Sequence, residues 1–237
     1  MLNIAAGWIA ALALGQAASV EDIVQPRLKD LSFTAQVVAG YQDELAKINK
    51  DFGNSYRVKN TFVRAKEPFM VRLESRIGDT DVRYILNGTT RVYSIPRARL
   101  NQREDLSDAP GKRQTFLDFG LITPSMVTGL FDAKFVRVDR ATGGLVFDLT
   151  YLKKWDDTSR HRIWVDREKR YVFRREWYGQ SGRLMATFAY ENPTESQGVW
   201  FPSRVTVRNA EGKVAGIMRY VDVKINSGLP DSLFSLR

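Results

Sequence analysis

Cysteine is absent from the 237 residues, and histidine occurs once, at His161. Without cysteine the chain has no disulfide, no thiolate metal site, no cysteine nucleophile and no lipidated cysteine as an anchor. One histidine cannot supply the usual zinc ligand sets. His161 also alternates with Ile163 and Val165, which favours packing on a strand over a role as a base. The sequence therefore predicts no metal site.

Catalytic signatures are also missing. There is no G-x-S-x-G elbow, Walker loop or G-x-G-x-x-G, and Gly111-Lys112-Arg113 lacks the flanking residues of a phosphate loop. The carboxylates Asp156-Asp157, and Asp105 with Asp108, lack the calcium-loop pattern and are typical of turns. Paired glycosidase carboxylates meet only in the fold, so the sequence leaves them open. We predict that the protein is not an enzyme and takes no cofactor.

An apolar run at the N-terminus, Ile4 to Leu14, is too short for a bilayer-spanning helix, which needs about 20 residues. No charged residue occurs before Glu21, and the small residues Gly15 and Ala17 suit a signal-peptidase site. We therefore expect residues 1–17 to be a signal peptide and residues 18–237 to form one exported domain. The alternative is a buried N-terminal helix of that domain.

Positive charge exceeds negative charge, with a formal net charge of +9. The densest stretch, Lys153 to Arg175, is either a solvated outer sheet face or a surface that attracts an anionic partner such as a membrane. Nucleic acid is disfavoured because the chain has no zinc-finger or RNP-type motif and is expected to be exported.

Period-two alternation dominates from Phe62 onward. Phe69, Val71, Leu73 and Ile77 fall on one face of a predicted strand, with charged residues on the other. Similar runs occur at Val82 to Leu86, Arg91 to Ile95, Lys134 to Val138, Leu145 to Leu152, His161 to Asp166, Tyr171 to Tyr178, Leu184 to Glu191, Trp200 to Arg208 and Ile217 to Ile225. Short turns such as Asn87-Gly88 separate them, so we expect an antiparallel meander. The polar stretch from Arg97 to Gln114 reads as a loop.

Helical signal is confined to three places. Ser19 to Leu31 offers a cap and apolar positions, although Pro26 interrupts it and the helix could begin there. Thr123 to Phe131 reads as a short amphipathic helix with Pro124 at its first position. Phe33 to Phe52 fits both a strand and a helix, and periodicity alone does not decide. A sheet of ten to eleven strands with so few helices must curl around its own apolar face, which leaves a cavity.

Several stretches together resemble the outer-membrane lipoprotein-sorting family, the LolA/LolB-like carriers. They are Phe62 to Leu73, Tyr84 to Pro96, Trp164 to Asp166 and Leu229 to Phe234, in this order along most of the chain. The resemblance implies an incomplete antiparallel β-barrel whose short helices cover an apolar cavity for acyl chains. It also implies a strand from Phe33 to Tyr41, and a lid position for the helix that contains Met126.

From the resemblance and the strand pattern we expect the cavity and lid to be lined by Phe33, Val37, Phe62, Phe69, Val71, Leu73, Tyr84, Tyr93, Met126, Leu130, Phe147, Trp164, Phe173 and Trp177. The carrier type has an arginine before the proline that follows its second long strand, and this arginine holds the lid. Here Glu67 precedes Pro68, so Arg64 and Lys66 are the candidates for a lid latch.

The resemblance implies a monomeric periplasmic carrier that binds lipoprotein acyl chains or another lipid for transfer towards the outer membrane. Its expected partners are the lipid cargo, an anionic membrane surface and an envelope hand-off protein. The alternative is an envelope sensory module of the same fold, which binds a lipid or protein signal without transporting it.

Overall fold

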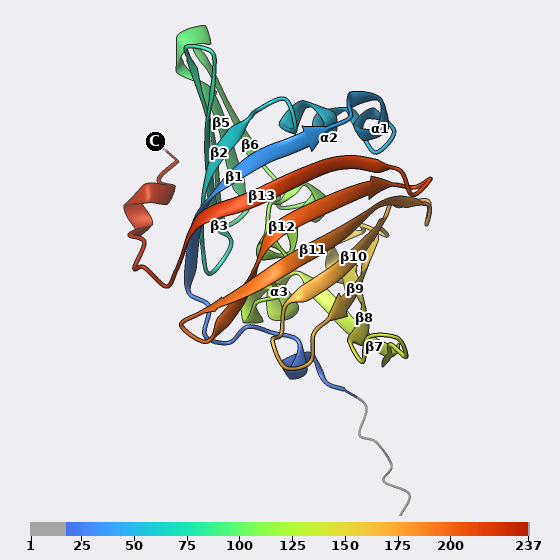
Figure 1. The fold of residues 1–237 in the computed structure, drawn as a ribbon. Helices are drawn as coiled ribbons and strands as arrows, with labels where there is room; N and C mark the ends of the chain where they lie inside the picture. Colours follow the sequence, from blue (N-terminus) through green and yellow to red (C-terminus); the bar gives the residue numbers. More distant parts are fainter. Residues whose placement is uncertain (1–17, 237) are drawn as a thin grey trace, which may run out of the picture.

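The computed structural model describes residues 18–236, so the expected signal peptide lies outside the described residues. Thirteen strands form one sheet in this part of the chain (Figure 1). They are β1 (Asp30–Gly40), β2 (Asn60–Lys66), β3 (Met70–Ile77), β4 (Thr80–Asn87), β5 (Thr90–Ile95), β6 (Leu100–Asp105), β7 (Phe131–Val138), β8 (Leu145–Tyr151), β9 (Arg160–Val165), β10 (Val172–Tyr178), β11 (Leu184–Ser196), β12 (Val199–Asn209) and β13 (Val214–Ile225).

The strand order is β6-β5-β4-β3-β2-β1-β13-β12-β11-β10-β9-β8-β7. Neighbours in the sheet are neighbours in the chain, except that β1 pairs with β13, and every pair is antiparallel. The two edge strands, β6 and β7, follow one another in the sequence and do not pair. The sheet is therefore curled but open, which confirms the predicted incomplete antiparallel barrel.

The sheet has two strands more than the eleven that were expected at most, and these are β2 and β6. The prediction of a loop from Arg97 to Gln114 was wrong for Leu100–Asp105, which pairs along its whole length with β5. The sequence Leu-Asn-Gln-Arg-Glu-Asp carries almost no apolar pattern because β6 is an edge strand, and charged edges are a common protection against aggregation.

Helices are short: α1 (Gln42–Ala46), α2 (Lys50–Ser55), α3 (Pro124–Gly129), and the 3-10 turns η1 (Val20–Asp22), η2 (Pro96–Ala98), η3 (Pro110–Lys112), η4 (Phe116–Phe119), η5 (Lys153–Trp155) and η6 (Asp231–Phe234). The predicted helix at Thr123 to Phe131 forms as α3, with Thr123 as N-cap and Pro124 in its first turn. The ambiguous stretch divides, because Phe33 lies in β1 while Phe52 lies in α2.

The predicted helix in Ser19 to Leu31 reduces to the single turn η1. Pro26 starts no helix; the chain runs irregularly until β1 begins at Asp30. Gln25 fixes this segment, since its backbone N–H donates to Ile122 O at 2.8 Å and its side-chain amide donates to the carbonyl oxygens of Lys169 and Arg170. Tertiary hydrogen bonds have replaced those of a helix.

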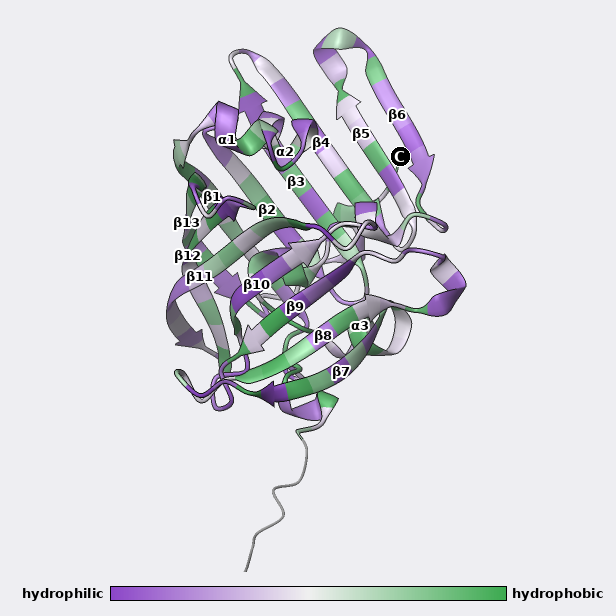
Figure 2. Cartoon of the chain, turned by 90° about the vertical axis from the view of Figure 1, so that its right-hand side faces the viewer, coloured by the Kyte–Doolittle hydropathy of each residue, from purple (hydrophilic) through white to green (hydrophobic). Residues whose placement is uncertain are grey.

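The core lies on the concave face of the sheet. Hydrophobic and hydrophilic residues alternate along most of the strands (Figure 2), so one face of these strands is apolar. Phe33 on β1 is fully buried, with its ring centroid 5.2 Å from those of Phe119 and Phe201 and 4.6 Å from that of Tyr220. Each such aromatic side chain contributes roughly 1.5–3 kcal/mol by burial. The rings fill the middle of the curled sheet.

The last residues of the chain lie on the opposite, outer face. The turn η6 packs beside β3 and β4 (Figure 1), and Phe234 is fully buried there. Asp30 directs this segment, because its carboxylate accepts hydrogen bonds from the backbone N–H groups of Ser227 and Gly228. The outer face of β2 to β4 is thus covered at one end only.

Candidate functional site

The inner wall of the candidate ligand site is set by strand register. Phe33, Val63, Leu73, Tyr84 and Tyr93 are successive cross-strand partners from β1 to β5. Phe33 and Val63 are buried, whereas Leu73 and Tyr84 are partly buried at the margin of the core. Burial raises the pKa of Tyr84 to about 12. This margin offers apolar surface next to the packed interior.

The residues predicted to line the cavity lie in three positions. Phe33, Val71, Met126, Leu130 and Phe147 are buried in the core. Partly buried side chains pack against it at Val37, Phe69, Leu73, Tyr84, Phe173 and Trp177. Tyr93 continues the inner wall opposite Tyr84, and the remaining two, Phe62 and Trp164, belong elsewhere.

The register places Phe62 and Trp164 on the outer face. Phe62 alternates with the inner Val63, and the guanidinium of Arg64 lies 3.9 Å from its ring centroid. Trp164 alternates with the inner Ile163, and its indole N–H donates to Asp139 Oδ2 at 3.2 Å. Both rings are covered by polar partners rather than by the core, a distinction that hydrophobicity alone does not reveal.

The inside of the sheet is closed by the segment 106–130, which connects the edge strands β6 and β7. Most of its apolar side chains are buried, namely Leu106, Phe116, Leu117, Phe119, Leu121, Ile122, Met126 and Leu130. We call residues 106–130 the lid segment. It ends in α3, which lies between the two halves of the curled sheet (Figure 1).

Glu67, at the turn between β2 and β3, binds the start of α3. Its Oε1 accepts hydrogen bonds of 2.8 Å from the hydroxyl groups of Thr123 and Ser125, and its Oε2 accepts a longer one of 3.4 Å from the backbone N–H of Ser125. Phe69 packs against Gly129 at the other end of the helix. The turn after β2 therefore holds α3 at both ends.

The two basic residues expected as latches bond elsewhere. Arg64 forms an ion pair with Glu74 on β3. Lys66 Nζ donates to Leu229 O at 2.7 Å and to Asp231 Oδ1 at 2.6 Å, and so binds the C-terminal segment. The contact with the lid comes from Glu67, the residue at which this sequence departs from the carrier pattern.

A polar cluster lies inside the sheet beneath the lid segment. Arg175 on β10 is buried, its Nη1 donates to Asp118 Oδ1 at 3.1 Å, and its guanidinium lies 3.9 Å from the ring centroid of Phe188. The hydroxyl of Tyr190 donates to Leu117 O at 3.0 Å. These bonds fasten η4 of the lid segment to the sheet.

His161 lies in the same interior, on β9. Its ring packs edge-on to Phe131 with 5.9 Å between centroids, and its Nδ1 is buried without a hydrogen-bond partner among the described residues. Burial, together with the charge of Arg175, holds the pKa of His161 well below its usual range. The side chain is a neutral member of the core.

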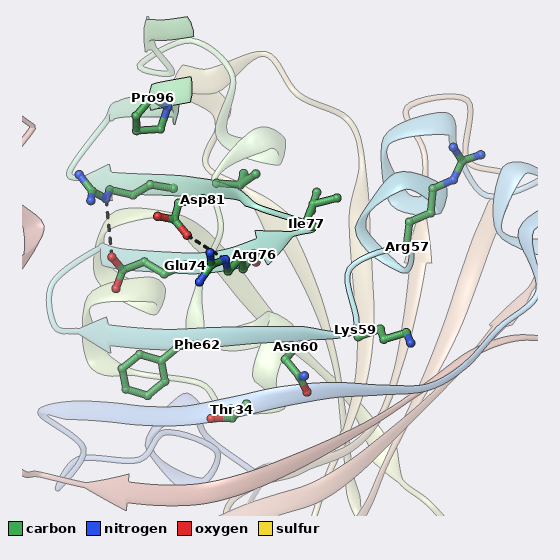
Figure 3. Close-up of a pocket in the computed structure, with 14 residues that line it drawn as sticks. Thr34, Arg57, Lys59, Asn60, Phe62, Glu74, Arg76, Ile77, Asp81 and Pro96 are labelled. Carbon is green, nitrogen blue, oxygen red and sulfur yellow. Dashed lines mark ion pairs between the residues drawn. The ribbon is translucent and has the colours of Figure 1, made fainter. Parts of the chain in front are cut away.

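A hollow of about 810 Å³ lies on the outer face of β1 to β4 (Figure 3). Four of the residues that line it, Thr34, Phe62, Glu74 and Arg83, are successive cross-strand partners on that face. The lining combines charged and polar side chains with apolar ones such as Phe62 and Val82. A smaller hollow of about 230 Å³ adjoins Lys47 and Asn209.

Within residues 18–236, no three or more His, Asp or Glu side chains are grouped so that they could hold a metal ion. No helix in this range is long and apolar enough to cross a membrane.

Solved structures share this architecture. A LolA superfamily protein from Nitrosomonas europaea matches with a TM-score of 0.57 and 18% identity, over 91% of this chain and 93% of that one. The chain has the LolA-like fold. A putative outer membrane lipoprotein-sorting protein domain from Vibrio parahaemolyticus matches with a TM-score of 0.54 and 11% identity, over 91% and 92% of the two chains.

The LolA-like fold is also found in a DUF1329 family protein from Desulfovibrio piger, at a TM-score of 0.52 and 13% identity over 91% and 92% of the chains. A family model described only as "Uncharacterized protein" matches residues 130–237. No curated protein matches the sequence. The LolA-like fold thus agrees with the family resemblance of the motifs, while sequence identity to these structures is low.

Proposed function

We propose that this chain is a non-catalytic periplasmic carrier that binds the acyl chains of a lipoprotein or another lipid between the inner wall and the lid segment, for transfer towards the outer membrane. The observation that carries the proposal is the lid itself. An open sheet with an apolar concave face is closed by residues 106–130, and Glu67 holds the α3 end of this segment by hydrogen bonds.

The free energy lost when the lid opens is comparable to the free energy gained when an acyl chain is buried, as a reversible lid requires. Opening α3 would give up hydrogen bonds to a carboxylate, each worth about 1.5–3 kcal/mol, together with the burial of Met126 and Leu130. An acyl chain of about sixteen carbons would return on the order of 10 kcal/mol, at about 0.8 kcal/mol for each buried CH2. The partly buried Leu73, Tyr84 and Tyr93 supply the wall against which such a chain would pack.

The cellular location and the cargo class rest on two further supports. The apolar run and small residues near the N-terminus are typical of a signal peptide. The LolA-like fold is shared with a structure described as a lipoprotein-sorting domain. A carrier needs no reacting group, which agrees with the lack of catalytic motifs in the sequence.

The test is mass spectrometry of the protein purified from the periplasm of its native host, combined with titration by a fluorescent palmitate analogue. We expect a co-purifying acylated molecule, and saturable fluorescence that unlabelled palmitate displaces. Acylated peptides in the spectrum would identify lipoprotein cargo, and phospholipids would identify a lipid carrier. Protein that carries no lipid and gives no saturable signal would contradict the proposal.

A further inference from the structure

The outer-face hollow is built around one carboxylate that three arginines share. Glu74 Oε1 accepts a hydrogen bond of 2.6 Å from Arg72, and Oε2 accepts one from Arg64. Arg83 Nε lies 3.6 Å from Oε1, too far for a good hydrogen bond. These side chains are partly buried, with 17–43% of the three arginine side chains exposed. One carboxylate cannot satisfy so many guanidinium donors.

Two donors remain unused. The Nε atoms of Arg72 and Arg83 are buried, and neither has a hydrogen-bond partner among the described residues. Arg72 is fixed from the other side, because its Nη1 donates to Leu233 O of the C-terminal segment at 2.7 Å. Arg64 is fixed by its stacking on Phe62. Arg72 and Arg64 are therefore held in place, and the three guanidinium groups together have more donors than Glu74 can accept.

The rest of the hollow adds positive charge. Arg57, Lys59 and Arg76 line it, and Asp81 is the second acidic residue of the lining. Asp81 lies 4.0 Å from Arg76, and both side chains are largely exposed, so this pair neutralises little. Hydrogen bonds from Arg72 and Arg64 lower the pKa of the Glu74 carboxyl, so Glu74 is ionised at neutral pH and still leaves cations in excess.

We propose that this hollow binds the phosphate group of a phosphate ester, with Arg83 as its principal ligand and Arg76 on the same face of the sheet. The planar guanidinium fork of Arg83 matches phosphate oxygens, and 43% of this side chain is exposed. A volume of about 810 Å³ admits the phosphate together with the group that it esterifies. Either a phospholipid headgroup or a soluble phosphate ester presents this chemistry.

The site is separate from the lid. It lies on the face of the sheet opposite Leu73 and Tyr84, so phosphate binding and acyl-chain binding are independent properties. If experiments find no phosphate binding, the proposal of acyl-chain binding is unaffected, and the reverse also holds.

The experiment titrates the full mature chain with sn-glycerol 3-phosphate, observed by NMR at the backbone amides of Glu74 and Asp81, two outer-face residues that line the hollow. In a second arm, the protein is floated with phosphatidylcholine vesicles that contain or lack phosphatidylglycerol. Binding in the first arm alone identifies a soluble phosphate ester, and binding in the second alone identifies a headgroup at a bilayer. Binding in both supports the phosphate site in either setting.

The variant Arg83→Gln should weaken binding at least tenfold, roughly the effect of one lost charge-assisted hydrogen bond. Arg76→Gln, at a position that is 68% exposed, should weaken it as well and tests the site if Arg83→Gln fails to fold. Arg137→Gln is the matched control, because Arg137 is 49% exposed and lies 3.6 Å from Asp139 at the far edge of the sheet. Absence of binding in both arms, or an equal loss in Arg137→Gln, would overturn the proposal.

Discussion

The carboxylate of Glu67 accepts a hydrogen bond of 2.8 Å from the hydroxyl of Thr123. The two residues are far apart in the sequence, and the bond joins the turn after β2 to the residue that precedes α3. A lid that must open is expected to be held by a few polar contacts of this kind, since they can be exchanged for water at modest cost.

Replacing Glu67 by alanine should loosen the lid. We expect the Glu67→Ala variant to lose about 1–3 kcal/mol of stability locally, and its amides at Met126 and Leu130 to exchange hydrogen faster. Both amides donate within the α3 region, to Thr123 O and Met126 O. Glu211→Ala is the control, because Glu211 is an exposed carboxylate paired with Lys47 on another part of the molecule. Unchanged exchange at Met126 and Leu130 would show that Glu67 does not hold the lid.

Filling the inner wall should block the proposed acyl site. In Leu73→Trp, the larger side chain occupies volume at the margin of the core, where a ligand chain would pack. We expect the affinity for a fluorescent palmitate analogue to fall about tenfold or more, equivalent to about 1.4 kcal/mol. Val38→Trp introduces the same ring at an exposed position and should leave the affinity unchanged. Equal affinities in the two folded variants would place the ligand elsewhere.

His161 should make the fold sensitive to acid. Its pKa in the folded chain is well below 6.5, so as pH falls through about 6.5 the unfolded chain takes up a proton that the folded chain refuses. The free energy of unfolding therefore decreases by up to about 1.4 kcal/mol per pH unit below that value, and His161 contributes no such loss above it.

The measurement is urea unfolding at pH 7.5 and pH 5.5 for the wild type and for His161→Leu. We expect the decrease in unfolding free energy between the two pH values to be about 1 kcal/mol smaller in the variant. Both proteins contain the same carboxylates, so the contribution of these groups to the pH dependence cancels when the two decreases are compared. The same decrease in both would mean that the pKa of His161 does not differ between the folded and unfolded chains.

Gly216 on β13 should tolerate no side chain. A Cβ at this position would collide with the ring of Tyr56, which caps the end of the sheet beyond α2. Gly216→Ala should therefore lower the unfolding free energy by about 1–3 kcal/mol through overpacking. At Gly53 in α2, a Cβ would meet its nearest neighbour at 3.7 Å, an ordinary contact. Gly53→Ala should be neutral or stabilising by up to about 1 kcal/mol, because alanine favours helix. Thermal denaturation of the two variants tests this pair.

Much of the fold could be predicted from the sequence. Strict alternation, as in Phe69 to Ile77, determined the strands, and turn residues such as Asn87-Gly88 determined the hairpins, because both depend on local backbone geometry. The short helix that begins at Pro124 could be predicted for the same reason, because its N-cap and first-turn proline are a local sequence pattern. The absence of cysteine and of catalytic motifs also limited the possible chemistry, because residue types and their spacing can be read directly along the chain.

Tertiary structure decided the rest. The edge strand β6 carries no apolar pattern, and only its pairing with β5 makes it a strand. Phe62 and Trp164 are as hydrophobic as their inward neighbours, yet register turns them outward, because successive residues of a strand face opposite sides. The bonds of Glu67 to the lid and the sharing of Glu74 by three arginines join separate segments of the chain. Such contacts depend on how the sheet curls, which no local pattern of residues specifies.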